Sequence, residues 1–194
     1  MKRVESNYSR WQDSTDVDDK VTTWLAHQFD TKAGNIRDLL YTQNATVYLL
    51  IWPIMEQVVF QGFMQGRSIV PIAEKMGSHF DEMDADDKAQ YFHDRYQNEY
   101  KYKHLTGSMK YEPMEAVLAK DYTQLNGTEK MILMMTTVFR YRNNIFHGMK
   151  AIVAWNEYSK EIAYCTEFMM AVVDIYRKYY SEELPKSIDH RPIL

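Results

Sequence analysis

Apolar residues recur at the three- and four-residue spacing of amphipathic helices along most of the chain. Regular alternation of apolar and polar residues, the pattern of a half-buried strand, does not compete with this helical spacing in any segment. The segments predicted to be helical are residues 16–29, 35–66, 68–77, 84–105, 112–122, 129–147 and 156–183. The pattern therefore predicts an all-α chain folded as a helical bundle.

The segment 35–66 is apolar on nearly all sides, so we expect it to be the central buried helix of the bundle. Pro53 lies inside it and predicts either a kink or the start of a new helix. Its most apolar part, VYLLIWPIMEQVVF, contains a single carboxylate, Glu56. An acid in such surroundings needs a partner, which makes Glu56 a candidate supporting residue.

The chain of 194 residues is long enough for one domain with a sizeable core. Hydrophobic residues make up 45% and charged residues 26%, as in ordinary globular proteins. We expect a polar N-terminal segment at 1–15, a single helical-bundle domain at 16–185 and a C-terminal tail at 186–194.

Several features favour a cytoplasmic protein without membrane contact. The single cysteine, Cys165, cannot form an internal disulfide, and its apolar neighbours indicate a core position. The first residues lack the apolar core of a signal peptide. The longest apolar run, 45–55, is well short of the roughly 20 residues that span a bilayer. The net charge of −4 argues against a general nucleic-acid coat and is compatible with a local basic cleft.

The predicted helix 129–147 ends in an unusual stretch, FRYRNNIFHG, which follows the apolar run MILMMTTV. Thr128 is a candidate N-cap of this helix, and Gly148 is a candidate stop. On a helical wheel one sector is apolar and contains Met131, Ile132, Met135, Val138, Phe139, Ile145 and Phe146. The opposite sector is polar and contains Thr136, Arg140, Asn143, Asn144 and His147.

Arg142 falls in the apolar sector, where an arginine needs either a partner or a route to solvent. In one interpretation its stem packs among apolar residues while the guanidinium reaches water at the helix end. In the other it pairs with Glu56, with bidentate geometry available to the two groups. The sequence leaves both interpretations open.

The polar sector offers hydrogen-bond donors and a titratable imidazole but no carboxylate. Arg140, Asn143 and Asn144 suit a phosphate or an RNA backbone, and His147 can move a proton near neutral pH. The same residue types are also common as capping residues at helix ends, so a purely structural role remains the alternative.

The stretch RNNIFHG resembles the R-x4-6-H signature of the HEPN superfamily, with Arg142, Asn143 and His147 in an R-N-x-x-x-H spacing followed by Gly148. The resemblance covers residues 40–182, and its specific part is Arg142–Gly148. It implies a helical bundle that forms a homodimer and brings two such motifs into one cleft. It also implies a metal-independent endoribonuclease that needs no cofactor and leaves a 2′,3′-cyclic phosphate.

The resemblance implies a catalytic role for each motif residue. His147 would act as general acid or base, Arg142 would hold the scissile phosphate, and Asn143 would orient the site. Arg140, Asn144 and Glu56 are supporting or substrate-binding candidates. On an ideal helix Arg142 and His147 lie about 140° apart. Both therefore reach one phosphate only if Arg142 wraps round, the helix unwinds near Gly148, or a second subunit supplies one of them.

The resemblance also implies biological settings and alternatives. A toxin or defence effector is the favoured setting, with a cognate antitoxin or regulatory protein as partner. Some HEPN toxins carry a tyrosine two residues after the histidine that a partner nucleotidyltransferase modifies, whereas this chain has Met149. The main alternative is a non-catalytic HEPN-like binding or regulatory module. A regulatory domain for a nucleotidyltransferase is a third hypothesis.

Two other segments carry possible chemistry. Residues 91–104 interleave aromatic and basic side chains that suit stacking on bases and contact with phosphates, although packing on the bundle is favoured. His79 precedes an acidic run at 81–87, which is interpreted as a helix start and not as a metal site, because no known ligand spacing matches.

Overall fold

The computed structural model describes residues 22–24, 26–27, 32–34, 43–107, 110–146 and 157–183. Across these residues the regular secondary structure consists of helices without any strand, which confirms the predicted all-α class. The predicted terminal segments 1–15 and 186–194 lie outside the described residues. Within the described part, no helix is long and apolar enough to cross a membrane.

The described residues contain seven α-helices with defined bounds and three short 3-10 helices. In chain order these elements are α3 (Gln43–Val59), α4 (Gly66–Met76), η2 (Gly77–Met83), α5 (Asp86–Tyr96), α6 (Glu99–Thr106), α7 (Glu112–Leu118), η3 (Tyr122–Gln124), α8 (Gly127–Phe146), α10 (Ser159–Tyr180) and η4 (Ser181–Glu183).

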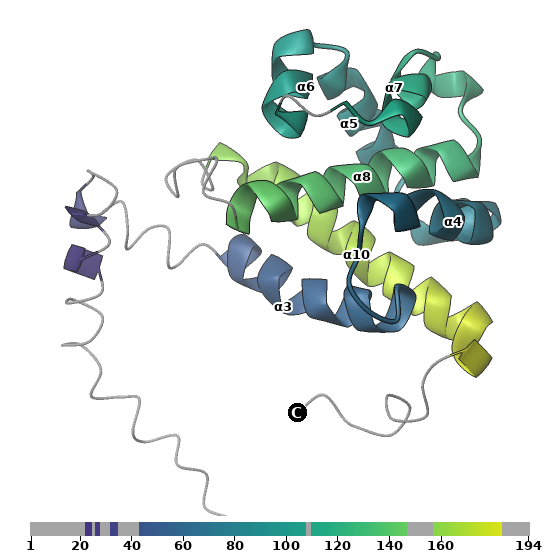
Figure 1. Ribbon diagram of the computed structural model, residues 1–194, viewed down its shortest axis with the longest axis horizontal. Helices are drawn as coiled ribbons and strands as arrows, with labels where there is room; N and C mark the ends of the chain where they lie inside the picture. Colours follow the sequence, from purple (N-terminus) through teal and green to yellow (C-terminus); the bar gives the residue numbers. More distant parts are fainter. Residues whose placement is uncertain are drawn as a thin grey trace, which may run out of the picture.

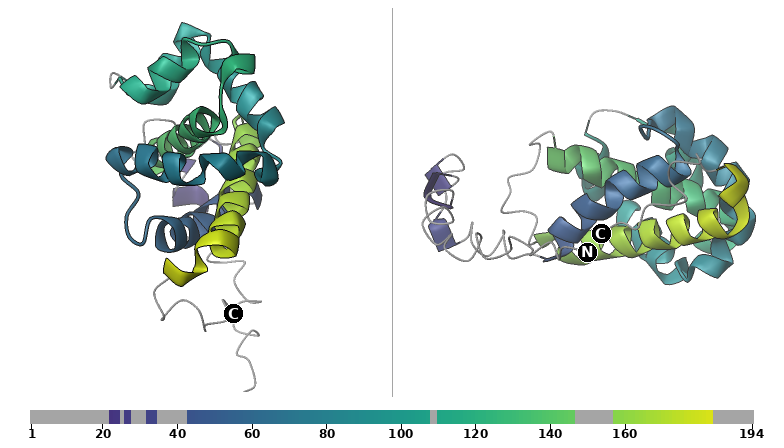
Figure 2. Two further views of the ribbon diagram at one scale, coloured as in Figure 1. Left: turned by 90° about the vertical axis from the view of Figure 1, so that its right-hand side faces the viewer. Right: turned by 90° about the horizontal axis from the view of Figure 1, so that it is seen from below.

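Helix α8 lies at the centre of these helices. It contacts α4, η2, α5, α6, α7 and α10, and every residue of Met131–Val138 is buried. Figure 1 shows α5, α6 and α7 on one side of α8 and the pair α3 and α10 on the other, and the left view of Figure 2 repeats this order. The side chains of α8 therefore form the middle layer of the core.

The prediction that segment 35–66 supplies the central buried helix is wrong. Its described helix, α3, packs mainly on α10 and leaves an outer apolar face, with Val47 39% and Leu50 65% exposed. Pro53 lies inside α3 on an exposed position and neither ends the helix nor starts a new one. The segment 35–66 is apolar on all sides, which predicted that it would be buried on all sides. The central helix is instead α8, because more helices pack against it.

Helices α3 and α10 run parallel, although they lie at opposite ends of the described chain. At their amino ends, the Asn44 amide donates to the Ser159 hydroxyl and carbonyl at 2.9 and 3.2 Å. Just beyond their carboxyl ends, the Gln61 amide donates to the Glu183 carbonyl at 2.9 Å. These two ties fix the register of α3, and so fix which of its side chains face the carboxyl end of α8.

Two predicted helix boundaries differ from the structure. The predicted polar helix 84–105 is two helices, because the Asn98 side chain accepts from the Lys101 N–H at 3.1 Å and caps the new helix α6. The N-cap of α8 is Asn126 and not Thr128. Asn126 accepts from the Glu129 N–H at 3.0 Å, and the Glu129 carboxylate accepts from the Asn126 N–H at 3.1 Å, which is a reciprocal capping box.

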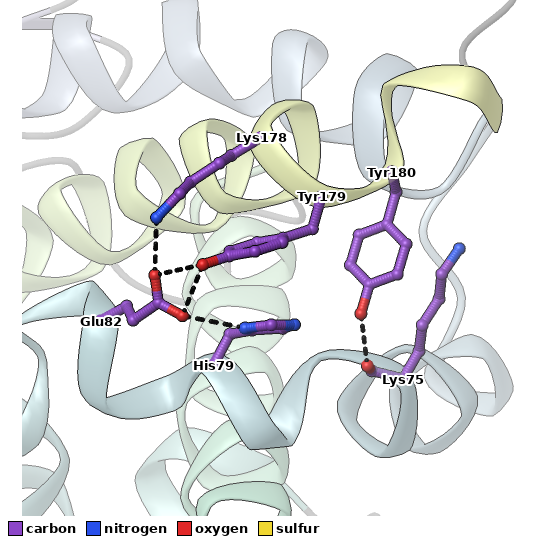
Figure 3. A network of polar contacts seen from close by, with 6 residues as sticks. All are labelled: Lys75, His79, Glu82, Lys178, Tyr179 and Tyr180. Atoms are coloured by element: carbon purple, nitrogen blue, oxygen red, sulfur yellow. Dashed lines mark hydrogen bonds and ion pairs between the residues drawn. The ribbon is translucent and has the colours of Figure 1, made fainter.

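A polar cluster ties η2 to the carboxyl end of α10 (Figure 3). The Glu82 carboxylate accepts from Lys178 Nζ at 2.8 Å and from the Tyr179 hydroxyl at 2.7 and 2.9 Å. His79 Nδ1 lies 3.0 Å from the same carboxylate, and its ring stacks on Tyr179 with centroids 4.0 Å apart. Hydrogen bonds from Lys178, Tyr179 and His79 lower the pKa of Glu82 to about 2. The acidic run 81–87 spans the end of η2 and the first turn of α5.

The lowered pKa predicts a specific acid sensitivity. Because the folded-state pKa of Glu82 lies below its unfolded value of about 4.3, its stabilising contribution is present above that value and is lost as the pH falls towards 2. We expect Glu82→Gln to lower the melting temperature at pH 7 and the difference from wild type to shrink as the pH falls below about 4, as measured by circular dichroism. Glu74→Gln, on the exposed face of α4, is the control and should show no such pH-dependent gap. An equal gap at pH 7 and pH 3 would contradict the prediction.

Candidate functional site

The stretch predicted to carry the chemistry forms the last turns of α8. Arg140, Arg142, Asn143 and Asn144 are part of the helix, which the structure describes up to Phe146. His147 and Gly148 lie outside the described residues. The geometry of the candidate site is therefore the geometry of the arginines and asparagines that precede His147.

Arg142 faces α3. Its guanidinium lies over the Trp52 ring, 5.6 Å from the centroid, and Nη1 donates to the Asn143 side-chain oxygen at 3.2 Å. The side chain is half-buried. Tyr48, one turn before Trp52, is fully buried. Burial raises the pKa of Tyr48, and the positive charge of Arg142 opposes that rise. An arginine on this apolar side is thus stabilised by aromatic faces and an amide.

The hypothesis of a Glu56–Arg142 ion pair is wrong, since no such pair occurs in the described residues. The Glu56 carboxylate instead accepts from the Met64 backbone N–H at 3.0 Å. That bond closes the turn between α3 and α4. A lone acid and a lone base on two apolar helices predicted a pair, but Glu56 binds the backbone of the following turn and Arg142 lies over Trp52.

Arg140 does not line an open polar face as the helical wheel predicted. It is only 8% exposed, and its Nε has no hydrogen-bond acceptor within the described part of the chain. It lies near Tyr102 and Tyr111. Burial raises the pKa of Tyr111, and the nearby charge of Arg140 opposes the rise. Thr136, one turn earlier, is also buried. Helices α6 and α7 pack against α8, and of the predicted polar sector Thr136 and Arg140 are buried while Asn143 and Asn144 are half-buried.

Asn144 serves as a tie between helices. Its side-chain amide donates to the Leu105 carbonyl, near the end of α6, at 3.2 Å. The structure therefore brings Arg142 and Asn143 together on the side of α3, and it places Arg140 and Asn144 on the side of α6 and α7. Glu56 lies apart from both groups, at the turn that follows α3.

A pocket opens beside these last turns of α8. Its lining comes from α5, α6, α8 and the residue before α10, and consists of Arg95, Tyr96, Tyr100, Lys101, His104, Leu105, Tyr141 and Tyr158. The helical-wheel reasoning missed this pocket, because Tyr141 was assigned to no face. The aromatic and basic pattern of residues 91–104 is the feature of the sequence that indicates this pocket. The prediction that these aromatic residues pack on the bundle is correct for Tyr96, which is buried, and wrong for Tyr100, which is 73% exposed.

No family model, no curated protein and no solved structure matches this chain.

The contact between Arg142 and Trp52 predicts a measurable coupling. Trp52→Leu and Arg142→Met should each lower the free energy of unfolding. Their combined effect should fall short of the sum by about 0.5–2 kcal/mol, because either change alone already removes the cation–π contact. Urea unfolding of the four proteins measures this coupling.

The matched control replaces Leu50, which lies on the exposed face of the same helix. Leu50→Ala and Arg142→Met should be additive within about 0.5 kcal/mol. Additivity of the Trp52 and Arg142 substitutions would show that the ring does not stabilise the guanidinium.

Proposed function

We propose that this protein is a metal-independent endoribonuclease of the HEPN type, in which Arg142, Asn143 and His147 form the catalytic site. The observation that supports the proposal most is the arrangement at the end of α8. Arg142 Nη1 donates to the Asn143 side-chain oxygen at 3.2 Å, and His147 follows four residues later in the sequence. A guanidinium, an amide and an imidazole are a suitable set of groups for a phosphodiester.

The chemistry follows from these side chains. The ribose 2′-oxygen attacks the adjacent phosphorus as its proton is removed, and a proton is delivered to the leaving 5′-oxygen. The two His147 side chains of the proposed dimer supply these roles, one as base and one as acid. The P–O5′ bond breaks, which leaves a 2′,3′-cyclic phosphate and a 5′-hydroxyl. Arg142 stabilises the charge that develops on the non-bridging oxygens, and Asn143 keeps the guanidinium oriented.

A dimer is part of the proposal. Arg142 faces α3, whereas a residue at 147 on a straight continuation of α8 would lie about 140° away. Two copies that bring their α8 ends together would let Arg142 of one copy and His147 of the other meet the same phosphate. A cytoplasmic toxin or defence effector, restrained by a cognate antitoxin or regulatory protein, is the setting that this activity fits.

A second candidate function is a non-catalytic binding or regulatory module. The observation that favours it is the structural engagement of both arginines, with Arg142 packed on Trp52 and Arg140 buried under α6 and α7. In this case the motif stabilises the bundle and the protein acts by docking to a partner.

RNA cleavage separates the two functions. Wild-type protein in EDTA should cut a mixed RNA and leave 2′,3′-cyclic phosphate ends, which are read out by end-specific ligation or mass spectrometry. His147→Ala should lower the rate by roughly 10²-fold or more because it removes the proton-transfer group. Arg142→Ala should lower it by a similar factor because it removes charge stabilisation.

His79→Ala is the matched control, because His79 lies in the cluster that joins η2 to the end of α10. It should cleave at the wild-type rate. Absence of cleavage by folded wild-type protein would favour the binding module. Equal cleavage by wild type and His147→Ala would show that the activity does not come from this motif.

A further inference from the structure

The pocket beside α8 is lined by side chains that have no part in the proposed catalytic mechanism. Three of its side chains, Arg95, Lys101 and His104, are basic, and four are tyrosines. No carboxylate belongs to its lining among the described residues. The protein as a whole is acidic, with a net charge of −4, so this concentration of basic and aromatic groups is local. Such a wall attracts an anion that also carries an aromatic group.

Arg95 is held in place before any ligand arrives. Its Nη1 lies 2.8 Å from the carboxylate of Glu161, which is buried on α10, and 3.4 Å from the Tyr91 hydroxyl. Its guanidinium also lies 5.7 Å from the centre of the Tyr158 ring. Glu161 balances part of the charge of Arg95, so the remaining fixed positive charge of the lining comes from Lys101, with the His104 ring beside it.

The outer part of the pocket is aromatic and faces solvent. Tyr100 and His104 lie one turn apart on α6, with ring centroids 4.8 Å apart. Among the described residues, Tyr100 is the most exposed tyrosine, with 73% of its surface accessible to solvent, and it makes no hydrogen bond to another described residue. Lys101 is the next residue on the same helix and is also exposed. A planar ring can therefore stack on Tyr100 while an attached anion reaches Lys101 and His104.

The size of the pocket limits what enters it. Its volume is about 40 Å³, whereas one water needs roughly 10–15 Å³. About three water molecules fit, so the pocket is too small for a nucleobase but can take the outer oxygens of a phosphate group. A nucleotide would accordingly place its phosphate inside and its base outside, against Tyr100.

We propose that this pocket binds the phosphate of one nucleotide of an RNA strand, with the neighbouring base stacked on Tyr100. The pocket lies beside the same end of α8 as the candidate catalytic residues. Tyr141 in its wall directly precedes Arg142, and the Asn144 amide donates to the carbonyl of Leu105 in its wall. The assignment to RNA rests on the proposed ribonuclease function. It makes the pocket a subsite that holds the strand next to the phosphodiester to be cut.

The test uses the full chain carrying His147→Ala, so that binding is measured without cleavage. Adenosine 5′-monophosphate, inorganic phosphate and adenosine are titrated separately by calorimetry or by NMR. Lys101→Ala should weaken binding of the monophosphate and of phosphate by about tenfold, the effect of one charge-assisted hydrogen bond. Tyr100→Ala should weaken the monophosphate by about fivefold or more and leave phosphate unchanged, because it removes only the stacking surface.

Lys103→Ala is the matched control, since Lys103 is an exposed lysine on the same helix and does not line the pocket. It should bind all three probes as the parent does. Because Tyr100, Lys101 and Lys103 are all exposed, these variants should keep the fold, which circular dichroism verifies. An equal effect of Lys101→Ala and Lys103→Ala would reduce the interaction to general charge attraction and overturn the proposal.

The outcomes for the pocket and for the catalytic function are separable. No binding of monophosphate or phosphate, together with RNA cleavage by the wild type, would overturn the subsite and leave the ribonuclease function standing. Binding with the expected Lys101 and Tyr100 effects, without any cleavage by the wild type, would keep the nucleotide site and refute the nuclease. If Tyr100→Ala changes the binding of phosphate and the binding of the monophosphate by the same factor, the assignment to a nucleotide is overturned.

Discussion

The burial of α8 along most of its length determines how the other helices are placed. Met131–Val138 are all buried, and α4, α5, α6, α7 and α10 pack against the helix. Helix α3 reaches it through the Tyr48 hydroxyl, which donates to the Val138 carbonyl at 2.7 Å. Because the middle of α8 is buried, this helix can present polar side chains to solvent or to a ligand only near its end, where it leaves the core. The arginines and asparagines of the motif occur at that end.

A buried charge must be stabilised by its surroundings. The two arginines at the end of α8 meet this requirement in different ways. Arg142 is half-buried, lies over the Trp52 ring and donates to the Asn143 side-chain oxygen. Arg140 is covered by α6 and α7 and lies among tyrosines. This difference makes Arg142 the better candidate for substrate contact and Arg140 the better candidate for holding α6 and α7 in position.

The class of the fold was readable from the sequence because apolar spacing and glycine breaks are local signals. Helices α4, α7 and α10 occur where the pattern placed them. The division between α5 and α6 was missed because it depends on one capping side chain, Asn98, inside a pattern that is otherwise helical. The exposed face of α3, the burial of Arg140 and the separate partners of Glu56 and Arg142 depend on which helices pack together. Periodicity within one segment contains no information about that packing. The pocket needs four separate segments to meet, and only its aromatic and basic composition was visible in advance.

Binding of nucleic acid at the carboxyl end of α8 is tested most directly by two-dimensional amide NMR of the ¹⁵N-labelled protein. Titration with a short RNA whose ribose at the cutting site lacks the 2′-hydroxyl locates the contact surface without turnover. We expect the largest shifts at residues 141–146 on α8 and at residues 100–105 on α6. Shifts centred on α4, on η2 or on the end of α10, or no shifts at saturating RNA, would contradict this expectation.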